Sequence, residues 1–348
     1  MKIKYSSFIL TLAILFGLSA SFGITLQKFE IADSLQFNIT DNLASGFNYG
    51  ISEQGVILFN DEVKYLTWLL FRSESYLGVL SLDGITNINL YGYFISFIYL
   101  IVGDWKPLFW IGIVFYLFFL RSLYLLADRI FNVRKASYIV SVFAIIPPVV
   151  DLSSGFMRDL LILAISMRVI LYTVERRYFL ILLSLLTLLV LRSFYLYLLF
   201  PLIYFAFSKN TNRTIFLSCT LWLVSLPILY IFKFGQGNFE EIVYRFVELI
   251  LGISKILFFN FRYSLVSAEA FNFYSGLTFL AFSATTYLMI IIKKFLLPKG
   301  FVILLILSLT LSTFYGYTLG FFVPRTKLIF LIGIGFLITQ MLITREKS

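Results

Sequence analysis

The chain has 348 residues, of which 60% are hydrophobic and only 13% are charged, and it carries a net charge of +10. A soluble domain has about 45–50% apolar and about 25% charged residues, so this composition excludes a soluble enzyme, a nucleic-acid-binding domain and a disordered chain. There is no histidine and a single cysteine, Cys219, which excludes Ser-His-Asp hydrolysis, histidine-ligated zinc and an intrachain disulfide. We therefore expect an all-α, polytopic integral membrane protein whose chemistry depends on Asp, Glu, Lys, Arg and Tyr.

The first apolar run extends from Phe8 to about Leu26 and follows Lys2 and Lys4. This pattern is typical of a secretory signal peptide, but the run is long enough to span a bilayer and many further apolar runs follow it. We therefore predict an uncleaved first helix with a cytoplasmic amino terminus.

A strongly acidic stretch comes next. Residues 27–90 contain eight Asp or Glu against three Lys or Arg, whereas the rest of the chain is basic. Since cytoplasmic loops are enriched in Lys and Arg, residues 27–106 are predicted to form an outer loop. Within it, the mixed run 63–80 and the apolar run 90–103 are predicted to lie as juxtamembrane helices on the outer face.

Further spans are predicted from apolar length and basic flanks. They are 107–127, 136–150, 157–174, 178–191, 193–207, 214–232, 274–292, 300–318 and 327–344. With the first helix they make about ten crossings in a single membrane domain over 1–348. Both termini are then cytoplasmic, and 233–273 form a second outer loop.

Ionisable groups at membrane depth are costly and by default mark a functional site. The predicted topology places four such groups on the outer face. They are Asp61-Glu62, Arg158-Asp159, Arg192, and Arg325 with Lys327.

The acids among them have two interpretations each. Asp61 and Glu62 could act as a general base or hold a divalent cation, but a carboxylate after Asn60 also suits a helix cap. Asp159 opens an apolar run, where it could bind a cation or a donor, or simply occupy the first helical turn. No metal ligand set is defined by the sequence.

The bases are harder to explain as anchors. Arg192 lies between two very apolar segments, which favours a functional role. Arg325 and Lys327 lie in an outer turn against the positive-inside rule, as a phosphate site would require, although a short turn can tolerate such a pair. Arg158 could bind an anion or snorkel to the headgroups.

The first half of the chain resembles the bacterial membrane glycosyltransferases of the type C superfold, relatives of protein mannosyltransferases and lipid A aminoarabinose transferases. The resemblance is carried by Asp61-Glu62 with Tyr65, the segment Gly92–Gly103, the run Arg121–Arg134, Pro147, and Arg158-Asp159. It implies that Asp61 or Glu62 is the catalytic base and that Asp159 is the second acid. The Phe- and Leu-rich composition and the outer arginines are also similar to O-antigen and capsule repeat-unit polymerases.

These resemblances imply a glycosyltransferase of cell-envelope polysaccharide assembly in a bacterial inner membrane. It would transfer sugar from a polyprenyl-phosphate or polyprenyl-pyrophosphate donor to a glycan or lipid-glycan acceptor on the outer face. The phosphate of the donor would be held by Arg158, Arg192, Arg325 and Lys327. The only cofactor that the resemblances leave open is a divalent cation bound by the acids. A lipid-linked glycan flippase is the alternative from another class, although no internal repeat supports it.

Overall fold

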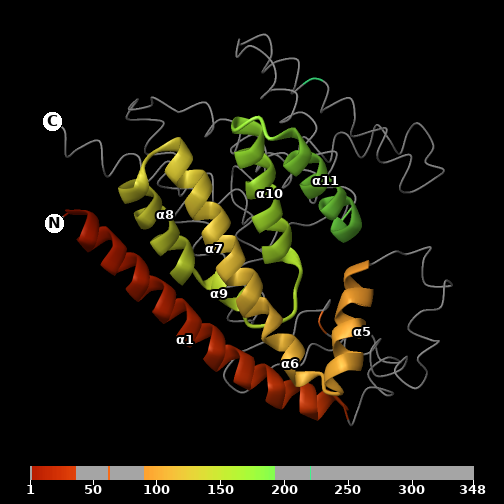
Figure 1. The fold of residues 1–348 in the computed structure, drawn as a ribbon. Coiled ribbons are helices and arrows are strands. Elements are labelled where there is room, and N and C mark those ends of the chain that lie inside the picture. The colour runs from red at the N-terminus through yellow and green to blue at the C-terminus, as the bar shows by residue number, and fades with distance from the viewer. Residues whose placement is uncertain (1, 37–61, 63–89, 193–219, 221–348) are drawn as a thin grey trace, which may run out of the picture.

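The computed structural model describes residues 2–36, 62, 90–192 and 220 (Figure 1). The described residues contain helices and no strand, which confirms the predicted all-helical architecture for this part of the chain. The helix predicted at 63–80, the outer loop at 233–273 and every span predicted after residue 192 lie outside the described residues.

The first helix, α1 (Lys2–Gln36), is 35 residues long and lies along one side of the bundle (Figure 1). It contains no proline, so the helix continues past the apolar run into the predicted outer loop. Gly17 lets α1 pack closely against its neighbours in the bundle, because a Cβ at this position would meet the carbonyl of Ala144 and the hydroxyl of Tyr116. Large apolar side chains such as Phe8 and Phe16 are exposed on α1, as a surface in contact with lipid would require.

After α5 (Leu90–Val102) the chain turns at Gly103, whose φ of 72° is readily adopted only by glycine. The carboxylate of Asp104 then accepts a hydrogen bond from the backbone N–H of Lys106 at 3.1 Å, which helps to start α6 (Lys106–Phe109).

The next helix, α7 (Ile111–Ile130), follows α6 almost without a break. Two stretches of helix are long and apolar enough to cross a membrane, Tyr5–Asp33 and Lys106–Arg129. They correspond to the first two spans predicted from the sequence.

The predicted span 136–150 is wrong as one continuous helix. The structure has α8 (Val133–Ile145), an extended residue at Ile146 with ψ of 135°, and a short α9 (Pro147–Ser153). Proline cannot donate a backbone hydrogen bond and disfavours helical geometry in the residue before it. The two consecutive prolines therefore end α8 after about 20 Å, at 1.5 Å per residue.

The last two described helices have bounds close to those of the predicted segments 157–174 and 178–191. They are α10 (Asp159–Val174) and α11 (Tyr178–Arg192), joined by a tight turn in which Arg176 has φ of 58°. Twelve of the sixteen side chains of α10 are buried, because it packs between α7 and α11. It is the central helix of the described bundle.

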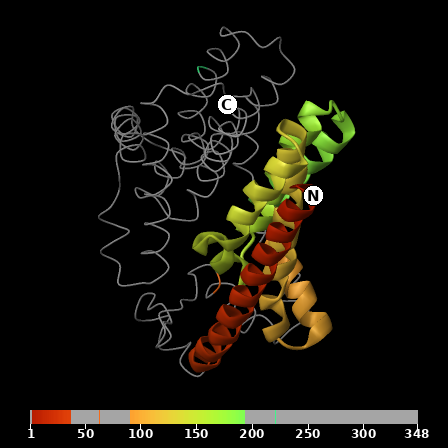
Figure 2. The same ribbon diagram turned by 90° about the vertical axis from the view of Figure 1, so that its left-hand side faces the viewer.

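The helices alternate in direction. The amino terminus of α1 and the α7–α8 and α10–α11 connections lie at one end, which Figures 1 and 2 show from two sides. We call this the basic end, because these connections carry Arg129, Arg134, Lys135, Arg176 and Arg177. The end of α1, α6 and the α9–α10 connection lie toward the other end. We call it the acidic end, because Glu30 and Asp33 lie near the end of α1 and Asp104 lies just before α6.

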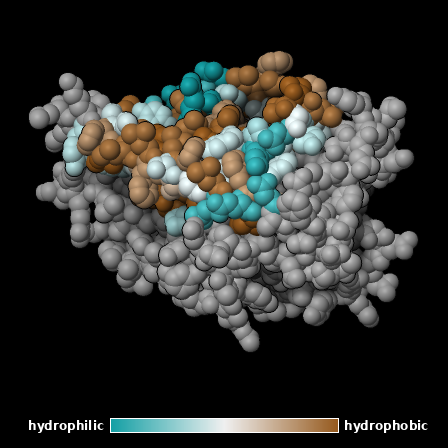
Figure 3. Space-filling model, turned by 90° about the horizontal axis from the view of Figure 1, so that it is seen from below, coloured by the Kyte–Doolittle hydropathy of each residue, from teal (hydrophilic) through white to brown (hydrophobic). Residues whose placement is uncertain are grey.

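The acidic end combines polar and apolar groups. Figure 3 views the molecule from this side and shows hydrophilic and hydrophobic residues side by side on the described surface. Aromatic rings hold α1 here, since Phe29 packs edge-on against Trp105, Phe109 and Trp110, with ring centroids 5.5–6.1 Å apart. The carboxylate of Asp33 also contacts Lys106 at 3.1 Å in a half-exposed ion pair.

Candidate functional site

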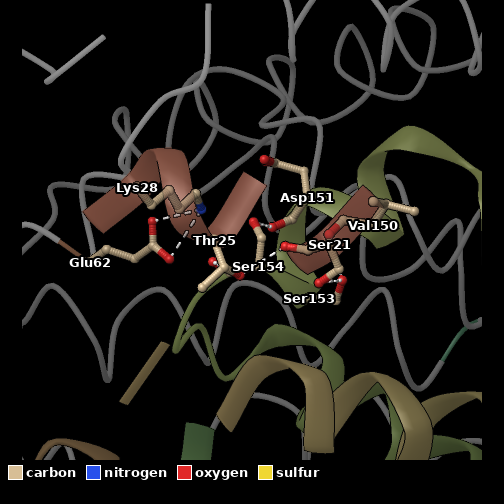
Figure 4. A network of polar contacts seen from close by, with 8 residues as sticks. All are labelled: Ser21, Thr25, Lys28, Glu62, Val150, Asp151, Ser153 and Ser154. Carbon is tan, nitrogen blue, oxygen red and sulfur yellow. Dashed lines mark hydrogen bonds and ion pairs between the residues drawn. The ribbon is translucent and has the colours of Figure 1, made fainter. Parts of the chain in front are cut away.

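A cluster of buried polar side chains joins α1 to the α9–α10 connection (Figure 4). We call it the polar cluster. Its members are Ser21, Thr25, Lys28, Glu62, Asp151, Ser153 and Ser154, and none of them is more than 9% exposed. Polar groups enclosed in this way cost free energy unless they are hydrogen-bonded or paired, so their mutual contacts carry information about the site.

The charged part of the polar cluster is an ion pair. Lys28 Nζ lies 3.1 Å and 3.3 Å from the two carboxylate oxygens of Glu62. Both side chains are 0% exposed. An isolated charge in such a place would be strongly unfavourable, and each group here compensates the other. The pair connects α1 to a residue from the stretch predicted as an acidic outer loop.

The neutral part is a set of hydroxyl contacts (Figure 4). Thr25 Oγ1 donates to the carbonyl of Ser21 at 2.8 Å and lies 3.3 Å from the carbonyl of Ser154. Ser153 Oγ is 2.8 Å from Ser21 Oγ, and Ser154 Oγ donates to the carbonyl of Asp151 at 2.6 Å. Residues 21, 25 and 28 lie on one face of α1, because neighbours on a helical face are three or four residues apart. This face binds the end of α9.

Two glycines let the backbone close around the ion pair. A Cβ on Gly155 would overlap Glu62 Oε1 and lie 3.4 Å from Lys28 Nζ. A Cβ on Gly112, at the start of α7, would meet the carbonyls of Gly155 and Ser153. The α9–α10 connection is therefore enclosed on both sides, and the hydroxyl of Tyr91 in α5 also donates to its Phe156 carbonyl.

Asp151 and Glu62 are the two carboxyl groups of the polar cluster, and both lie outside the two membrane-length helices. Burial raises the pKa of Asp151 from 3.8 to about 7, since a carboxylate loses its hydration there. Lys28 opposes this rise in pKa and Glu62 adds to it. The cluster thus holds two carboxyl groups and one ammonium, and one carboxyl group can exchange a proton near neutral pH.

Arg158 and Asp159, two of the predicted site residues, begin α10. Asp159 is the first residue of α10 and is 7% exposed. Arg158 precedes it and is half-buried, and its Nη1 donates to the carbonyl of Leu191 at 2.9 Å. Arg192 is the last residue of α11, so this bond brings Arg158 next to the backbone of Arg192.

The other predicted site residues are placed as follows. Glu62 is in the polar cluster, and Gly155, which abuts its carboxylate, is three residues before Arg158. Asp61, Arg325 and Lys327 lie outside the described residues. Within the described part of the chain, no three acidic or cysteine side chains come together in a way that could hold a metal ion.

Sequence reasoning missed Lys28 and Asp151 as site residues. In the sequence, Lys28 is one of three bases in the acidic stretch 27–90 and has no neighbouring residue that marks it as a site residue. Its signal was the spacing of Ser21, Thr25 and Lys28, which puts three polar groups on one face of an apolar helix. Asp151 comes three residues after Pro148 and directly after the predicted span 136–150. A polar residue at that position is expected wherever an apolar span ends, so it does not stand out as a site residue.

The chain was compared with known protein families, curated proteins and solved structures. None of the three comparisons finds a match.

Proposed function

We propose that this chain is a membrane glycosyltransferase of bacterial cell-envelope polysaccharide assembly. It would transfer a sugar or oligosaccharide from a polyprenyl-phosphate or polyprenyl-pyrophosphate donor on the outer face of the cytoplasmic membrane. One observation carries the proposal: the buried acids Glu62 and Asp151 lie in the polar cluster, beside the α9–α10 connection that leads directly into Arg158 and Asp159.

The positive-inside rule orients this arrangement. If the basic end faces the cytoplasm, the acidic end faces outward, together with its buried acids and Arg158. Transfer from a lipid-linked phosphate needs a carboxylate to accept the proton of the attacking hydroxyl and a cation to stabilise the departing phosphate. In this orientation the acidic end would offer both kinds of group on the outer side of the membrane.

The two adjacent carboxylates then take different roles. Glu62 is fully enclosed and both of its oxygens bind Lys28. A general base must reach the acceptor hydroxyl, so we assign this role to Asp61 and treat Glu62 as its anchor. Asp159 is the second acid of the site.

The phosphate site would be built around Arg158. The bond to the Leu191 carbonyl orients its guanidinium at the start of α10, and a guanidinium matches phosphate oxygens in two directions. Arg192 belongs to the same region through its place in the chain after Leu191. Arg325 and Lys327 would complete the site from the last outer turn.

The test is transfer by the purified protein from short-chain polyprenyl-phosphate and polyprenyl-pyrophosphate sugars, with products resolved by mass. General base catalysis contributes about 10²–10⁴-fold, so Asp61→Asn should reduce the rate by that factor. Asp104→Asn, which changes an exposed acid at the same end, is the matched control and should leave the rate unchanged. Full activity in both Asp61→Asn and Glu62→Gln would remove the base assignment.

The same assay separates the rival functions. A single added unit supports a glycosyltransferase, and a ladder of repeat units supports a repeat-unit polymerase. Movement of the labelled lipid across proteoliposomes without a new glycosidic bond would indicate a flippase. No transfer from any polyprenyl donor would reject the proposal.

A further inference from the structure

Two arginines lie well inside the helices α7 and α10, which pack side by side (Figure 1). Arg121 belongs to the stretch Lys106–Arg129, which is long and apolar enough to cross a membrane, and Arg168 belongs to α10. Arg121 is exposed and Arg168 is half-buried. A charged side chain at membrane depth is costly unless it is paired, so the surroundings of the two guanidinium groups are informative.

Arg168 is held in place by two groups of α7. Its Nε donates to Ser122 Oγ at 3.1 Å, and its Cζ lies over the ring of Phe118, 5.7 Å from the ring centroid. The Ser122 hydroxyl accepts this bond because its own proton is donated to the Phe118 carbonyl at 2.8 Å. A hydroxyl and an aromatic ring therefore orient the guanidinium without neutralising its charge.

The direction of the Arg168 side chain differs from that of an anchor. Arg168 is six residues before the end of α10, whereas Ser122 and Phe118 are eight and twelve residues before the end of α7. Both helices end at the basic end, so the side chain extends away from the basic end and toward the middle of α7. An arginine that snorkels to headgroups at the basic end would extend the opposite way.

Arg121 begins from the same turn of α7. It precedes Ser122 and follows Phe118 by three residues, so it lies on the same helical face as the ring that Arg168 covers. This face continues toward the acidic end with Leu117 and Val114, which are 44% and 63% exposed. Arg121 is therefore an exposed charge that borders an exposed apolar surface.

Neither arginine has an acidic partner among the described residues, since no ion pair there includes Arg121 or Arg168. The nearest acids in the sequence are Asp128 for Arg121 and Glu175 for Arg168. Each is seven residues nearer the basic end, about 10 Å along the helix axis. Arg168 also uses only one of its five N–H groups in hydrogen bonds to described residues.

We propose that Arg168 and Arg121 bind the phosphate group of a membrane lipid on this face of α7. A guanidinium matches phosphate oxygens with two parallel hydrogen bonds, and basic groups between membrane helices are known to bind lipid headgroups. The apolar surface of Leu117 and Val114 selects a lipid over a free anion, because the lipid chains cover these side chains. Local thinning of the bilayer brings lipid phosphate to arginines at membrane depth. This site does not depend on the function proposed above.

Binding is measured by native mass spectrometry of the full-length protein in detergent, titrated with dioleoyl phosphatidic acid. Dioleoylglycerol has the same chains without the phosphate, and inorganic phosphate has the anion without the chains. We expect phosphatidic acid to bind at least about tenfold more tightly than either, because a hydrogen bond to a charged group contributes at least the free energy of a factor of ten in affinity.

Charge-removing variants locate the lipid. Arg168→Gln and Arg121→Gln should each weaken binding of phosphatidic acid by about tenfold. Arg121 is exposed, so its variant tests the site even if Arg168→Gln does not fold. Arg177→Gln is the matched control, because it removes an exposed arginine in the α10–α11 connection that pairs with Glu175 at 2.8 Å. Its affinity should equal that of the wild-type protein.

Three results would overturn the site. The first is equal affinity of the wild-type protein for phosphatidic acid and dioleoylglycerol, or unchanged affinity in the folded arginine variants. The second is a loss of affinity in Arg177→Gln as large as that in Arg121→Gln, which would place the lipid at the basic end. The third is binding of inorganic phosphate as tight as that of phosphatidic acid, which would show a site for a free anion in place of a lipid.

Discussion

Replacement of Asp151 by asparagine should remove a pH dependence of stability that the wild-type protein shows. Asp151 is buried in the polar cluster, and burial raises its pKa to about 7. The folded protein therefore keeps the proton over a pH range in which the unfolded chain releases it. Asparagine has a similar shape and cannot ionise, so it imitates the protonated acid at every pH.

The sign and size follow from linkage. Below about pH 4 the group is protonated in both states and costs nothing. As the pH rises from 3.8 to about 7 the unfolded chain ionises first, and the stability of the wild-type protein falls. At 1.36 kcal/mol per pKa unit, the stability lost over this pH interval is roughly 4 kcal/mol. Above about pH 7 the loss does not grow further, because the group is ionised in both states. Lys28 reduces this loss and Glu62 increases it.

The assay is the melting midpoint of the detergent-solubilised protein between pH 4.5 and 8. The wild-type midpoint should fall by several degrees relative to that of Asp151→Asn as the pH rises. Asp104→Asn replaces an exposed acid, whose hydration changes little on folding, and its midpoint should follow the wild-type curve. Parallel curves for wild-type and Asp151→Asn across this range would refute the argument from burial.

Three further predictions concern contacts of the described helices, each checked by the melting midpoint. Gly112→Ala should destabilise the protein by about 1–3 kcal/mol, because its Cβ would meet backbone carbonyls, whereas Gly23→Ala has open space and should be neutral or better. Arg158→Ala should lower the free energy of unfolding by about 1–3 kcal/mol, because the Leu191 carbonyl at the end of α11 loses its donor. A melting midpoint equal to that of the wild-type protein would show that this hydrogen bond does not stabilise the fold. Tyr116→Phe should cost about 0.5–1.5 kcal/mol through the 2.8 Å hydrogen bond to the last turn of α8, and a gain in stability would contradict it.

The helical elements of the described region are largely predictable from local sequence. The apolar runs at 107–127, 157–174 and 178–191 correspond to helices in the structure, and a charged residue lies at or beside each of their ends except the start of α7. The apolar run 90–103 likewise forms α5. The break at Pro147 is also a local signal, because proline restricts the residue before it wherever it occurs, and the expectation of one continuous span overlooked it.

The candidate site was only partly predictable. Glu62, Arg158 and Asp159 stand out in the sequence because charges are rare beside apolar runs. That Glu62 is enclosed together with Lys28 and lies against Gly155 is visible only once α1 and the α9–α10 connection are brought together.

By itself, the sequence determined that the chain is apolar, that its described part is helical, and where the helices of that part run. The tertiary structure decided which of those charges are partners, how deeply each is buried, and that the pKa of Asp151 lies near neutrality. The physical reason is that helix formation depends on neighbours within a few residues. Burial and pairing depend on contacts such as that between residues 28 and 62, which no local pattern specifies.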